Sequence, residues 1–325
     1  MLQIQNALGI LSSQVPTGNL LWVDQVNGVD ALATRGRMTI PFKTLSAAKN
    51  AAQSGDTIMV LPGTYDEDDL LKDDVNWFFF PGAIIDSTSG SPVFDTDASS
   101  ITSIIGGHGE FYADGIVVNF AGSDAEITLE ALRMESRNEQ CIRCTSASGR
   151  IHVKVFDSIK APSGVAIECN GSATEQIFEA DSIDAGGYSI YGLAGGAYVK
   201  ARTILCDSVP IKIEGGSAFV VEAFEIIPAS DNSGVYHNTT AALLTVRGAR
   251  IVSTGSASAV YIADAASNKV RLSECLLIAD SGIPAIDAAN AATQVHVLGG
   301  TAGNRDKGSN ITVVPGSWVF NGALT

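Results

Sequence analysis

The sequence predicts an all-β chain that forms a single-stranded right-handed parallel β-helix, with a short capping helix near the N-terminus. Short runs rich in Val and Ile are separated by turn-forming residues, and 33 of the 325 residues are Gly. No helical 3.6-residue pattern persists beyond residue 55. Apolar residues also recur at intervals of 21 to 26 residues, which indicates a repeat architecture. Because each repeat contains only strands and turns, helical solenoids and leucine-rich repeats are excluded.

Three ladders of apolar residues, one residue per coil, carry this repeat from residue 150 onward. The first ladder comprises Val153, Ile177, Tyr198, Val220, Leu244, Val270 and Val295. The second ladder comprises Ile159, Ile183, Ile204, Ile226, Ile251, Leu277 and Ala302. The third ladder comprises Ile167, Ile190, Ile211, Tyr236, Tyr261 and Ile286. We expect these side chains to point into the core, so that each ladder marks one strand of every coil. Left-handed hexapeptide helices use about 18 residues per coil, so the longer spacing favours the right-handed type.

Residues 21–67 contain the most specific motifs of the chain. They include Pro41-Phe42-Lys43-Thr44 and then Gly55-Asp56-Thr57-Ile58, which leads to Pro62-Gly63-Thr64-Tyr65. These motifs resemble the opening coil of the pectate-lyase-like (pectin-lyase-like) family of right-handed parallel β-helix proteins. The resemblance implies one β-helix domain over residues 21–325. Lyases, hydrolases, adhesins and phage tailspikes share this fold, so it does not decide the chemistry.

A short helix is expected within this opening coil, where it would cover the open end of the β-helix and shield its strand edges. Thr44 or Ser46 can cap it, and it should run to about Gln53 through four alanines. Residues 1–20 carry no Lys or Arg and no long apolar centre. We expect them to form an extended or docking segment rather than a secretion signal.

Composition excludes several classes of partner. The chain has 20 basic and 35 acidic residues, a net charge of −15, so neither nucleic acid nor an anionic membrane is an expected partner. No apolar run approaches the roughly 18 residues that span a bilayer. The five cysteines are an odd number, so we expect reduced thiols rather than a disulfide framework.

Three acidic residues are the candidates for catalysis. Asp157 and Asp181 each lie two residues before a second-ladder Ile, which places them on neighbouring coils, and Glu130 lies one coil earlier. Paired carboxylates about 5 to 9.5 Å apart can hydrolyse glycosides, and the next coil offers Arg202 as a basic group. An Asp-Ser turn repeated for backbone hydrogen bonding explains the same residues without catalysis.

Two further motifs are weaker candidates for functional sites. Gly107-His108-Gly109 resembles a polygalacturonase motif, but the aspartate pairs that precede the histidine in that family are missing. A turn between two strands explains it more simply. The acidic run at residues 66–69, with Asp73 and Asp74, lacks the spacing and the glycine of an EF-hand and is expected to be a solvated loop.

Cysteine and histidine do not form a recognisable metal site in the sequence. The spacing of Cys141 and Cys144 fits half of a zinc site, but there is no second pair, so the cysteines are interpreted as core residues. His152, His237 and His296 are expected to point outward on separate coils. We therefore predict neither a metal nor a cofactor.

Outward positions suggest a self-association surface. Residues one position after a ladder residue should face away from the core. Many of these are apolar, and the expected interface comprises Phe178, Val199, Leu205, Val221, Ile227, Val252 and Ile278. Since no long loop between the ladders could cover them, another copy of the chain is the expected partner.

The expected function is therefore a non-enzymatic structural or attachment role. By fold-level analogy with trimeric phage tailspikes, we expect a homotrimer on a virion surface: a short tailspike, a fibre or a capsid decoration. Residues 1–20 would bind other virion proteins, and a cell-surface glycan is a further expected partner. The alternative is a polysaccharide lyase or glycoside hydrolase acting on an acidic bacterial glycan, and a third reading is an extracellular or cell-surface adhesin.

Overall fold

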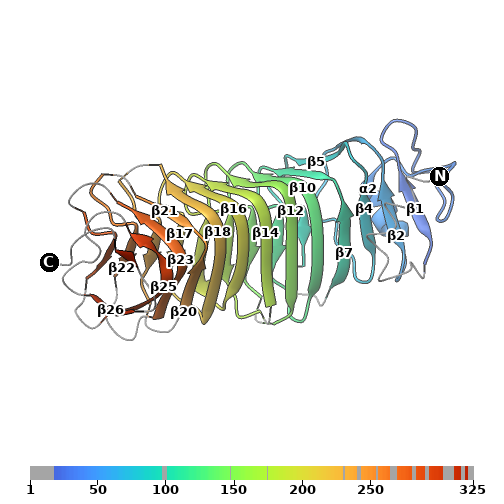
Figure 1. Ribbon diagram of the computed structural model, residues 1–325. Coiled ribbons are helices and arrows are strands. Elements are labelled where there is room, and N and C mark those ends of the chain that lie inside the picture. Colours follow the sequence, from blue (N-terminus) through green and yellow to red (C-terminus); the bar gives the residue numbers. More distant parts are fainter. Residues whose placement is uncertain are drawn as a thin grey trace.

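In the computed structural model the chain winds into a parallel β-helix (Figure 1). The structure describes residues 18–96, 101–146, 148–173, 175–229, 231–239, 243–253, 255–263, 269–279, 283–289, 293–302, 311–315 and 319–320, with only the backbone described from residue 293. The strands stack side by side along one axis, with β1 and the helix α2 at one end and β26 at the other (Figure 1). The expected docking segment falls almost wholly outside the described residues.

A large sheet wraps two sides of each coil. Its 18 strands are β1 (Leu20–Val23), β2 (Thr57–Val60), β3 (Gly63–Tyr65), β4 (Asn76–Phe79), β5 (Ala83–Ser87), β7 (Thr102–Gly107), β8 (Glu110–Ala113), β10 (Glu126–Ser136), β12 (Arg150–Ala161), β14 (Glu175–Ala185), β16 (Ala197–Cys206), β18 (Ala218–Pro228), β20 (Leu243–Arg247), β21 (Arg250–Val252), β23 (Lys269–Ile278), β25 (Thr293–Ala302), β26 (Ile311–Pro315) and β27 (Val319–Phe320). Neighbouring strands pair in parallel, one coil onto the next.

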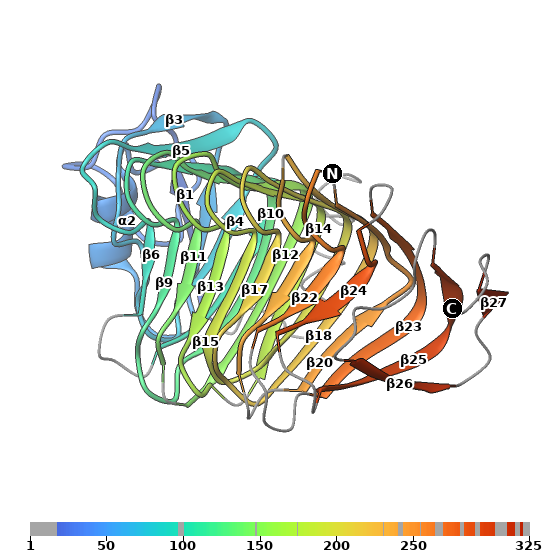
Figure 2. The same ribbon diagram turned by 90° about the vertical axis from the view of Figure 1, so that its left-hand side faces the viewer.

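A second sheet closes the third side of the coil. Its nine strands are β6 (Phe94–Asp95), β9 (Val118–Phe120), β11 (Ile142–Cys144), β13 (Ile167–Asn170), β15 (Ile190–Ala194), β17 (Ile211–Ile213), β19 (Val235–His237), β22 (Val260–Ile262) and β24 (Ile286–Ala288). Figure 2 shows these short strands running side by side in chain order, in front of the long strands of the large sheet. These findings confirm the predicted all-β parallel β-helix.

Two stacked rows of buried side chains fill the core beneath each long strand. The row before the bend consists of Leu129, Val153, Phe178, Val199, Val221, Val246 and Leu272. The row after the bend consists of Met134, Ile159, Ile183, Ile204, Ile226, Ile251 and Leu277. The second of these rows confirms the second predicted ladder residue by residue, and its register continues to Ala302.

The first predicted ladder is wrong over three coils. Val153 pairs with Phe178 rather than with Ile177, so the prediction slipped by one residue there and carried the error into the next two coils. A slip of one residue in a strand exchanges its two faces. The expectation that Phe178, Val199 and Val221 form an outward interface is therefore wrong, because all three are fully buried in the core.

The third predicted ladder slips in the same way after Ile211. Ile211 pairs with Val235, and Val235 pairs with Val260, so Tyr236 and Tyr261 face outward instead of inward. His237, which was expected on the surface, is consequently buried.

The opening coil contains the predicted helix, α2 (Leu45–Ala51), which packs against β1 and β2. Thr44 is its N-cap, since the Thr44 hydroxyl accepts a hydrogen bond from the amide of Ala47. The two oxygens of the Glu67 carboxylate accept hydrogen bonds from the amides of Leu45 and Ser46, the first two residues of the helix. At the other end the ammonium of Lys72 donates to two carbonyls of the helix. Both helix ends are therefore satisfied by side chains.

A buried ion pair ties the start of the chain to this coil. Asp56 is fully buried, and its carboxylate accepts two hydrogen bonds from Arg35, at 2.5 and 2.6 Å. It also accepts from the amides of Asn19 and Gln53, both at 2.8 Å. Burial alone would raise the pKa of Asp56, but these hydrogen bonds lower it overall. The Gly55-Asp56-Thr57-Ile58 motif thus has a structural role in closing the first coil.

All five cysteines are buried and free of disulfides, which confirms their interpretation as core residues. Cys144 and Cys169 occupy neighbouring positions in register on β11 and β13. Burial raises the pKa of every one of these thiols. Within the described residues no helix is long and apolar enough to cross a membrane.

Candidate functional site

The predicted catalytic acids lie at or near the bends of the long strands. Each long strand turns a corner between its two core rows, and a small number of residues at the corner project to the surface. Asp157 occupies this corner on β12, and Asp181 occupies it on β14. The sequence therefore placed these two carboxylates correctly on neighbouring coils.

Each of these aspartates is paired with its own arginine. Asp157 accepts hydrogen bonds from Arg133 at 3.0 and 2.6 Å, and Asp181 accepts from Arg202 at 2.7 and 2.8 Å. The bonds from Arg202 hold the pKa of Asp181 below its ordinary value. A glycosidase acid needs the opposite, a raised pKa, beside a second carboxylate that stays ionised.

Glu130 does not join the two aspartates. It lies before the bend of β10, in register with Lys154, and one of its carboxylate oxygens is buried without a hydrogen-bond partner. The structure therefore places Glu130 in the row before the bend and the two aspartates at the bend itself.

A row of alternating charges, here called the charged row, runs along the surface beside the bends. In register on consecutive coils it consists of Glu130, Lys154, Glu179, Lys200, Glu222 and Arg247. At one end, Glu222 accepts from Tyr198 at 2.8 Å and from Arg247 at 3.1 Å, and the Tyr198 bond is the main reason that the pKa of Glu222 is lowered. Each pair of opposite charges on neighbouring strands stabilises a sheet by about 0.2–1 kcal/mol.

Among the residues that the structure describes, no carboxylate lies within ion-pair distance of the two lysines of the charged row, although Lys200 contributes to the lowered pKa of Glu222. The ammonium of Lys154 lies 5.2 Å from the centre of the Phe156 ring, in cation–π geometry. Lys200 is exposed and has no carboxylate within 4.0 Å among the described residues. Glu179 lies between them along the row and 4.0 Å from the Nε2 atom of His152.

A hollow of about 430 Å³ lies where the charged row meets the bends. We call it the corner groove; its rim consists of Lys154, Phe156, Glu179, Lys200, Arg202 and Phe224. Its lining also includes Val155, Ala180 and Ala201, which pack against the core. A second hollow of about 450 Å³ shares Phe224 and Lys200 with it and continues past Ala223 towards Arg247. The corner groove therefore extends over several coils.

Two phenylalanine side chains stand exposed at the bends of this groove. Phe156 is 39% exposed and Phe224 is 66% exposed. The ring of Phe156 stacks on His108, with ring centres 5.0 Å apart and planes 8° from parallel. Sequence reasoning missed both residues as site candidates, although Phe224 was the odd apolar member of a series that otherwise contains Asp157, Asp181 and Arg202.

His108 belongs to a turn, as the simpler interpretation of its motif predicted. The turn joins β7 to β8, and Gly107 adopts a φ of 106°, where a Cβ atom would lie 2.1 Å from the Phe79 carbonyl oxygen. The glycine is thus required by the backbone.

The second sheet presents an aromatic surface that the sequence did not predict. Tyr191, Lys212, Tyr236 and Tyr261 form one outward row in register, here called the tyrosine row. The Lys212 ammonium lies over the rings of Tyr188, Tyr191 and Tyr236, 4.7 to 5.9 Å from their centres. Desolvation, followed by the hydrogen bond to Glu214, raises the pKa of Tyr191 to about 12.

The remaining outward apolar residues of the predicted interface do face outward. Leu205 pairs with Ile227, and Val252 pairs with Ile278, all half-buried on the outer side of the strands after the bend. We call these four residues the apolar row. The same outward position holds Glu135, Lys160 and Asp184 on the three preceding coils. This outward position is thus charged on the coils of Glu135, Lys160 and Asp184 and apolar on the four coils of the apolar row.

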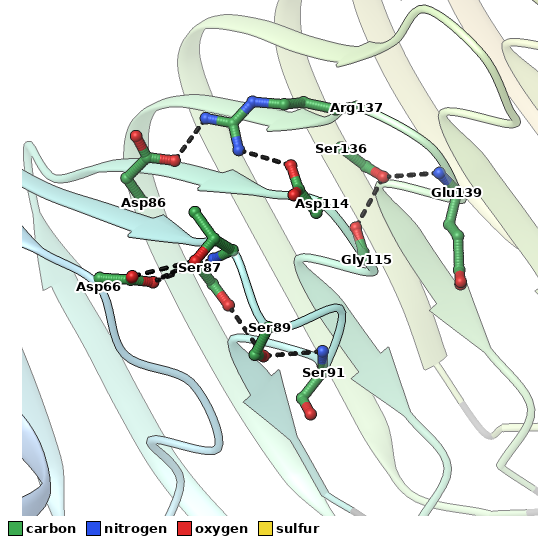
Figure 3. Close-up of polar contacts among 11 residues, drawn as sticks. Asp66, Asp86, Ser87, Ser89, Ser91, Asp114, Gly115, Ser136, Arg137 and Glu139 are labelled. Carbon is green, nitrogen blue, oxygen red and sulfur yellow. Dashed lines mark hydrogen bonds and ion pairs between the residues drawn. The ribbon is translucent and has the colours of Figure 1, made fainter.

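Polar contacts elsewhere join coils to one another. The guanidinium of Arg137 pairs with Asp114 on the preceding coil and with Asp86 on the coil before that (Figure 3). The hydrogen bond to Asp86 is the largest cause of the raised pKa of Arg137. The acidic run acts similarly, since Asp66 accepts from the backbone and hydroxyl of Thr88. Over the residues that the structure describes, no three His, Cys, Asp or Glu side chains gather as metal ligands.

A shallow hollow of about 340 Å³ lies at the starts of β10, β12 and β14. Its polar lining includes Arg150, which lies 3.9 Å from Glu126 and 3.8 Å from Glu175, and His152. These side chains are about half exposed and loosely paired, as expected for a solvated strand surface. His152 thus faces outward as predicted, while the side chain of His296 lies outside the described residues.

Comparison of the chain with protein-family models, with curated proteins and with solved structures found no match.

Proposed function

We propose that this chain is a non-enzymatic structural or attachment protein that assembles side by side with copies of itself. The observation that carries the proposal is the apolar row of Leu205, Ile227, Val252 and Ile278. Aliphatic side chains at the same outward place on four successive coils extend over about 14 Å of the rod, at roughly 4.8 Å per coil. A contiguous apolar surface of this kind is typical of an interaction site.

The direction of the apolar row favours a particular mode of assembly. Because it runs along the rod, another copy would pack with its axis roughly parallel to the first. By analogy with other parallel β-helix assemblies, three copies around a common axis satisfy this geometry, so we propose a homotrimer. By the same analogy we propose a place on a virion surface, as a short tailspike, a fibre or a capsid decoration, with residues 1–20 attaching the rod to other virion proteins.

The paired aspartates support a non-enzymatic role over the alternative of a polysaccharide lyase or glycoside hydrolase. Arg202 holds the Asp181 carboxylate in its ionised form and lowers its pKa, so Asp181 is not poised to donate a proton at neutral pH. The Asp157 carboxylate is likewise engaged by Arg133. Ion pairs that link successive coils also account for these residues without any reaction.

The self-association proposal is tested by measuring molar mass with multi-angle light scattering at micromolar concentration. We expect the wild type at three times the chain mass and the double variant Ile227→Asp/Val252→Asp at the mass of one chain. A buried unpaired carboxylate costs roughly 3–5 kcal/mol. A loss of about 3 kcal/mol weakens association roughly 150-fold.

The matched control is Val26→Asp, which introduces the same charge at an apolar residue that is 79% exposed in the opening coil. It should leave the mass unchanged. A monomeric wild type, or a double variant with the wild-type mass, would contradict the interface. Release of reducing ends or double bonds from a bacterial polysaccharide, lost in Asp157→Asn or Asp181→Asn, would contradict the non-enzymatic role.

A further inference from the structure

Two rows of outward side chains flank the same corner of the coil, the turn that joins each long strand to the following short strand. The first row, here called the strand flank, lies at the ends of the strands after the bend and consists of Glu135, Lys160 and Asp184 followed by the apolar row. The second row, here called the tyrosine flank, lies at the second residue of the short strands and consists of Arg143 and Glu168 followed by the tyrosine row. Each residue of the strand flank therefore has a counterpart on the tyrosine flank of the same coil.

The charged counterparts have opposite signs on two successive coils. Glu135 shares its coil with Arg143, and none of the residues that the structure describes forms an ion pair with either. The next coil carries Lys160 and Glu168, which are likewise without an ion pair in this part of the chain. The Glu168 side chain faces outward but is only 9% exposed, and no described residue donates a hydrogen bond to it. A carboxylate that is largely covered and unpaired is costly in free energy, so a cation from outside the copy stabilises it.

Further along the flanks the counterparts combine aliphatic with aromatic side chains. Ile227 shares its coil with Tyr236, and Val252 shares its coil with Tyr261. All four side chains are half-buried. Tyrosine is enriched in protein interfaces, because its ring supplies a large rigid contact area with a polar end. The match ends on the next coil, where the counterpart on the tyrosine flank is Asp287.

The pattern of charges selects one relative height for two neighbouring copies. A closed ring around an axis parallel to the rods sets the same residue of every copy at the same height. Level flanks then place opposite charges side by side on both charged coils. A shift of one coil, about 4.8 Å, places Glu135 beside Glu168. A shift the other way places Lys160 beside Arg143. Like charges meet in both shifted arrangements, so the level arrangement of a closed ring is favoured.

We propose that the strand flank of one copy packs against the tyrosine flank of the next copy at the same height, with the corner between the flanks turned towards the common axis. Lys160 then pairs with Glu168 of the next copy, and the apolar row lies on the tyrosine rings. The corner turns carry the exposed carboxylates of Asp207 and Asp231, so the copies meet along the flanks and the tips of the corners remain hydrated. This inference rests on the proposed self-association and names the surface that receives the apolar row.

Disulfide cross-linking of the full chain tests which surfaces meet. With oxidised glutathione as the oxidant, Ile227→Cys/Tyr236→Cys should form covalent dimers and trimers, resolved on a non-reducing gel. Each single variant should form at least about fivefold less, because equal residues of two copies lie on different flanks. Ile227→Cys/Tyr191→Cys is the height control, since its second site lies two coils away, about 10 Å along the rod. The wild type controls for the five native cysteines, all of which are buried.

A charge exchange tests the height of the flanks. Lys160→Glu should weaken self-association at least about tenfold, because like charges then meet at every contact. Lys160→Glu/Glu168→Lys exchanges the two charges and should restore self-association to within about threefold. Glu135→Arg/Arg143→Glu exchanges the other pair and serves as a second test that leaves the covered carboxylate in place. The matched control is Lys200→Glu, since Lys200 also lies between two acids of the neighbouring coils but on neither flank. It should leave self-association unchanged, and melting temperatures check that all variants remain folded.

The proposal is overturned if Ile227→Cys alone cross-links as well as the double variant, because the apolar row then packs on itself. A wild-type trimer that neither cross-links through Ile227→Cys/Tyr236→Cys nor responds to Lys160→Glu also overturns it, while the proposed self-association stands. A monomeric wild type contradicts both proposals.

Discussion

Two adjacent residues of β14 provide a direct test of which face of the strand points inward. Phe178 is 0% exposed and stacks between Val153 and Val199 of the neighbouring coils, whereas Ile177 is half-buried on the outer surface. Replacing a buried Phe by Ala costs about 3–5 kcal/mol, because apolar contacts are lost and a cavity remains. Ile177→Ala removes a partly exposed side chain and should cost about 1 kcal/mol, mostly through strand propensity.

Urea unfolding, followed by far-ultraviolet circular dichroism, measures this difference. With a slope of about 3 kcal/mol per molar urea, a loss of 4 kcal/mol lowers the unfolding midpoint by roughly 1 M. We expect that shift for Phe178→Ala and about a quarter of it for Ile177→Ala, with the slope unchanged in both. Equal shifts, or a larger shift for Ile177→Ala, would refute the assigned register and restore the original first ladder.

Two further predictions concern the opening coil and the thiols. Asp56→Asn should lower the free energy of unfolding by about 3 kcal/mol at pH 7, the low end of the value for a buried ion pair, because its partner Arg35 is partly exposed. Because the pKa of Asp56 is lowered in the folded chain, the Asp56 carboxylate stabilises the fold above its ordinary pKa of 3.8, and this stabilisation is lost as the pH falls through the folded-state pKa. The free energy of unfolding, measured from pH 7 to pH 3, should therefore depend less on pH in the variant than in the wild type. Equal pH dependence in the two proteins would contradict this prediction. Burial raises the pKa of the thiols, to about 12 for Cys169 and about 11 for Cys206. An aromatic disulfide reagent should therefore modify all five cysteines only after the chain is denatured. Rapid reaction of the native chain would show that at least one thiol is accessible.

The bends explain which ladders could be predicted. Along a long strand the residue of the second core row follows that of the first by five positions on most coils, as from Phe178 to Ile183, but by six on β12, from Val153 to Ile159. The extra residue belongs to a two-residue corner that exists on β12 and not on the following coils. The first ladder is counted from Val153, which lies on the coil with the extra residue. The predicted core positions on the next three coils are therefore displaced by one residue. The second ladder starts after the bend and was therefore unaffected.

The short strands of the second sheet pose a different problem. In a three-residue strand such as Val235–His237 the pattern of inward and outward positions contains too few residues to reveal a period of two. Tyr236 is apolar enough to resemble a core residue, and His237 is polar enough to resemble a surface residue. In the structure Tyr236 faces outward and His237 faces the core. The register of the neighbouring strands determines which face a residue occupies, whatever the hydrophobicity of that one residue.

The candidate site was predictable in position but not in its contacts. Counting residues from the second ladder placed Asp157 and Asp181 on neighbouring coils, and the structure agrees. It was not possible to know that Asp157 pairs with the preceding coil through Arg133 while Asp181 pairs with the following coil through Arg202. Arginine side chains are long enough to reach either way, and only the local geometry of the bend selects one direction.

Outward rows on a parallel β-helix differ in whether they can satisfy themselves. A row of alternating charge neutralises itself along the stack, as between Glu222 and Arg247, and needs no partner. An apolar row such as Leu205 and Ile227 cannot do so, because stacking like residues leaves their outer surface in contact with water. The exposed ring of Phe224 lies only three residues before Ile227, about 10 Å along the same strand. A copy of the chain packed on the apolar row would therefore lie close to the bend at which Phe224 is exposed.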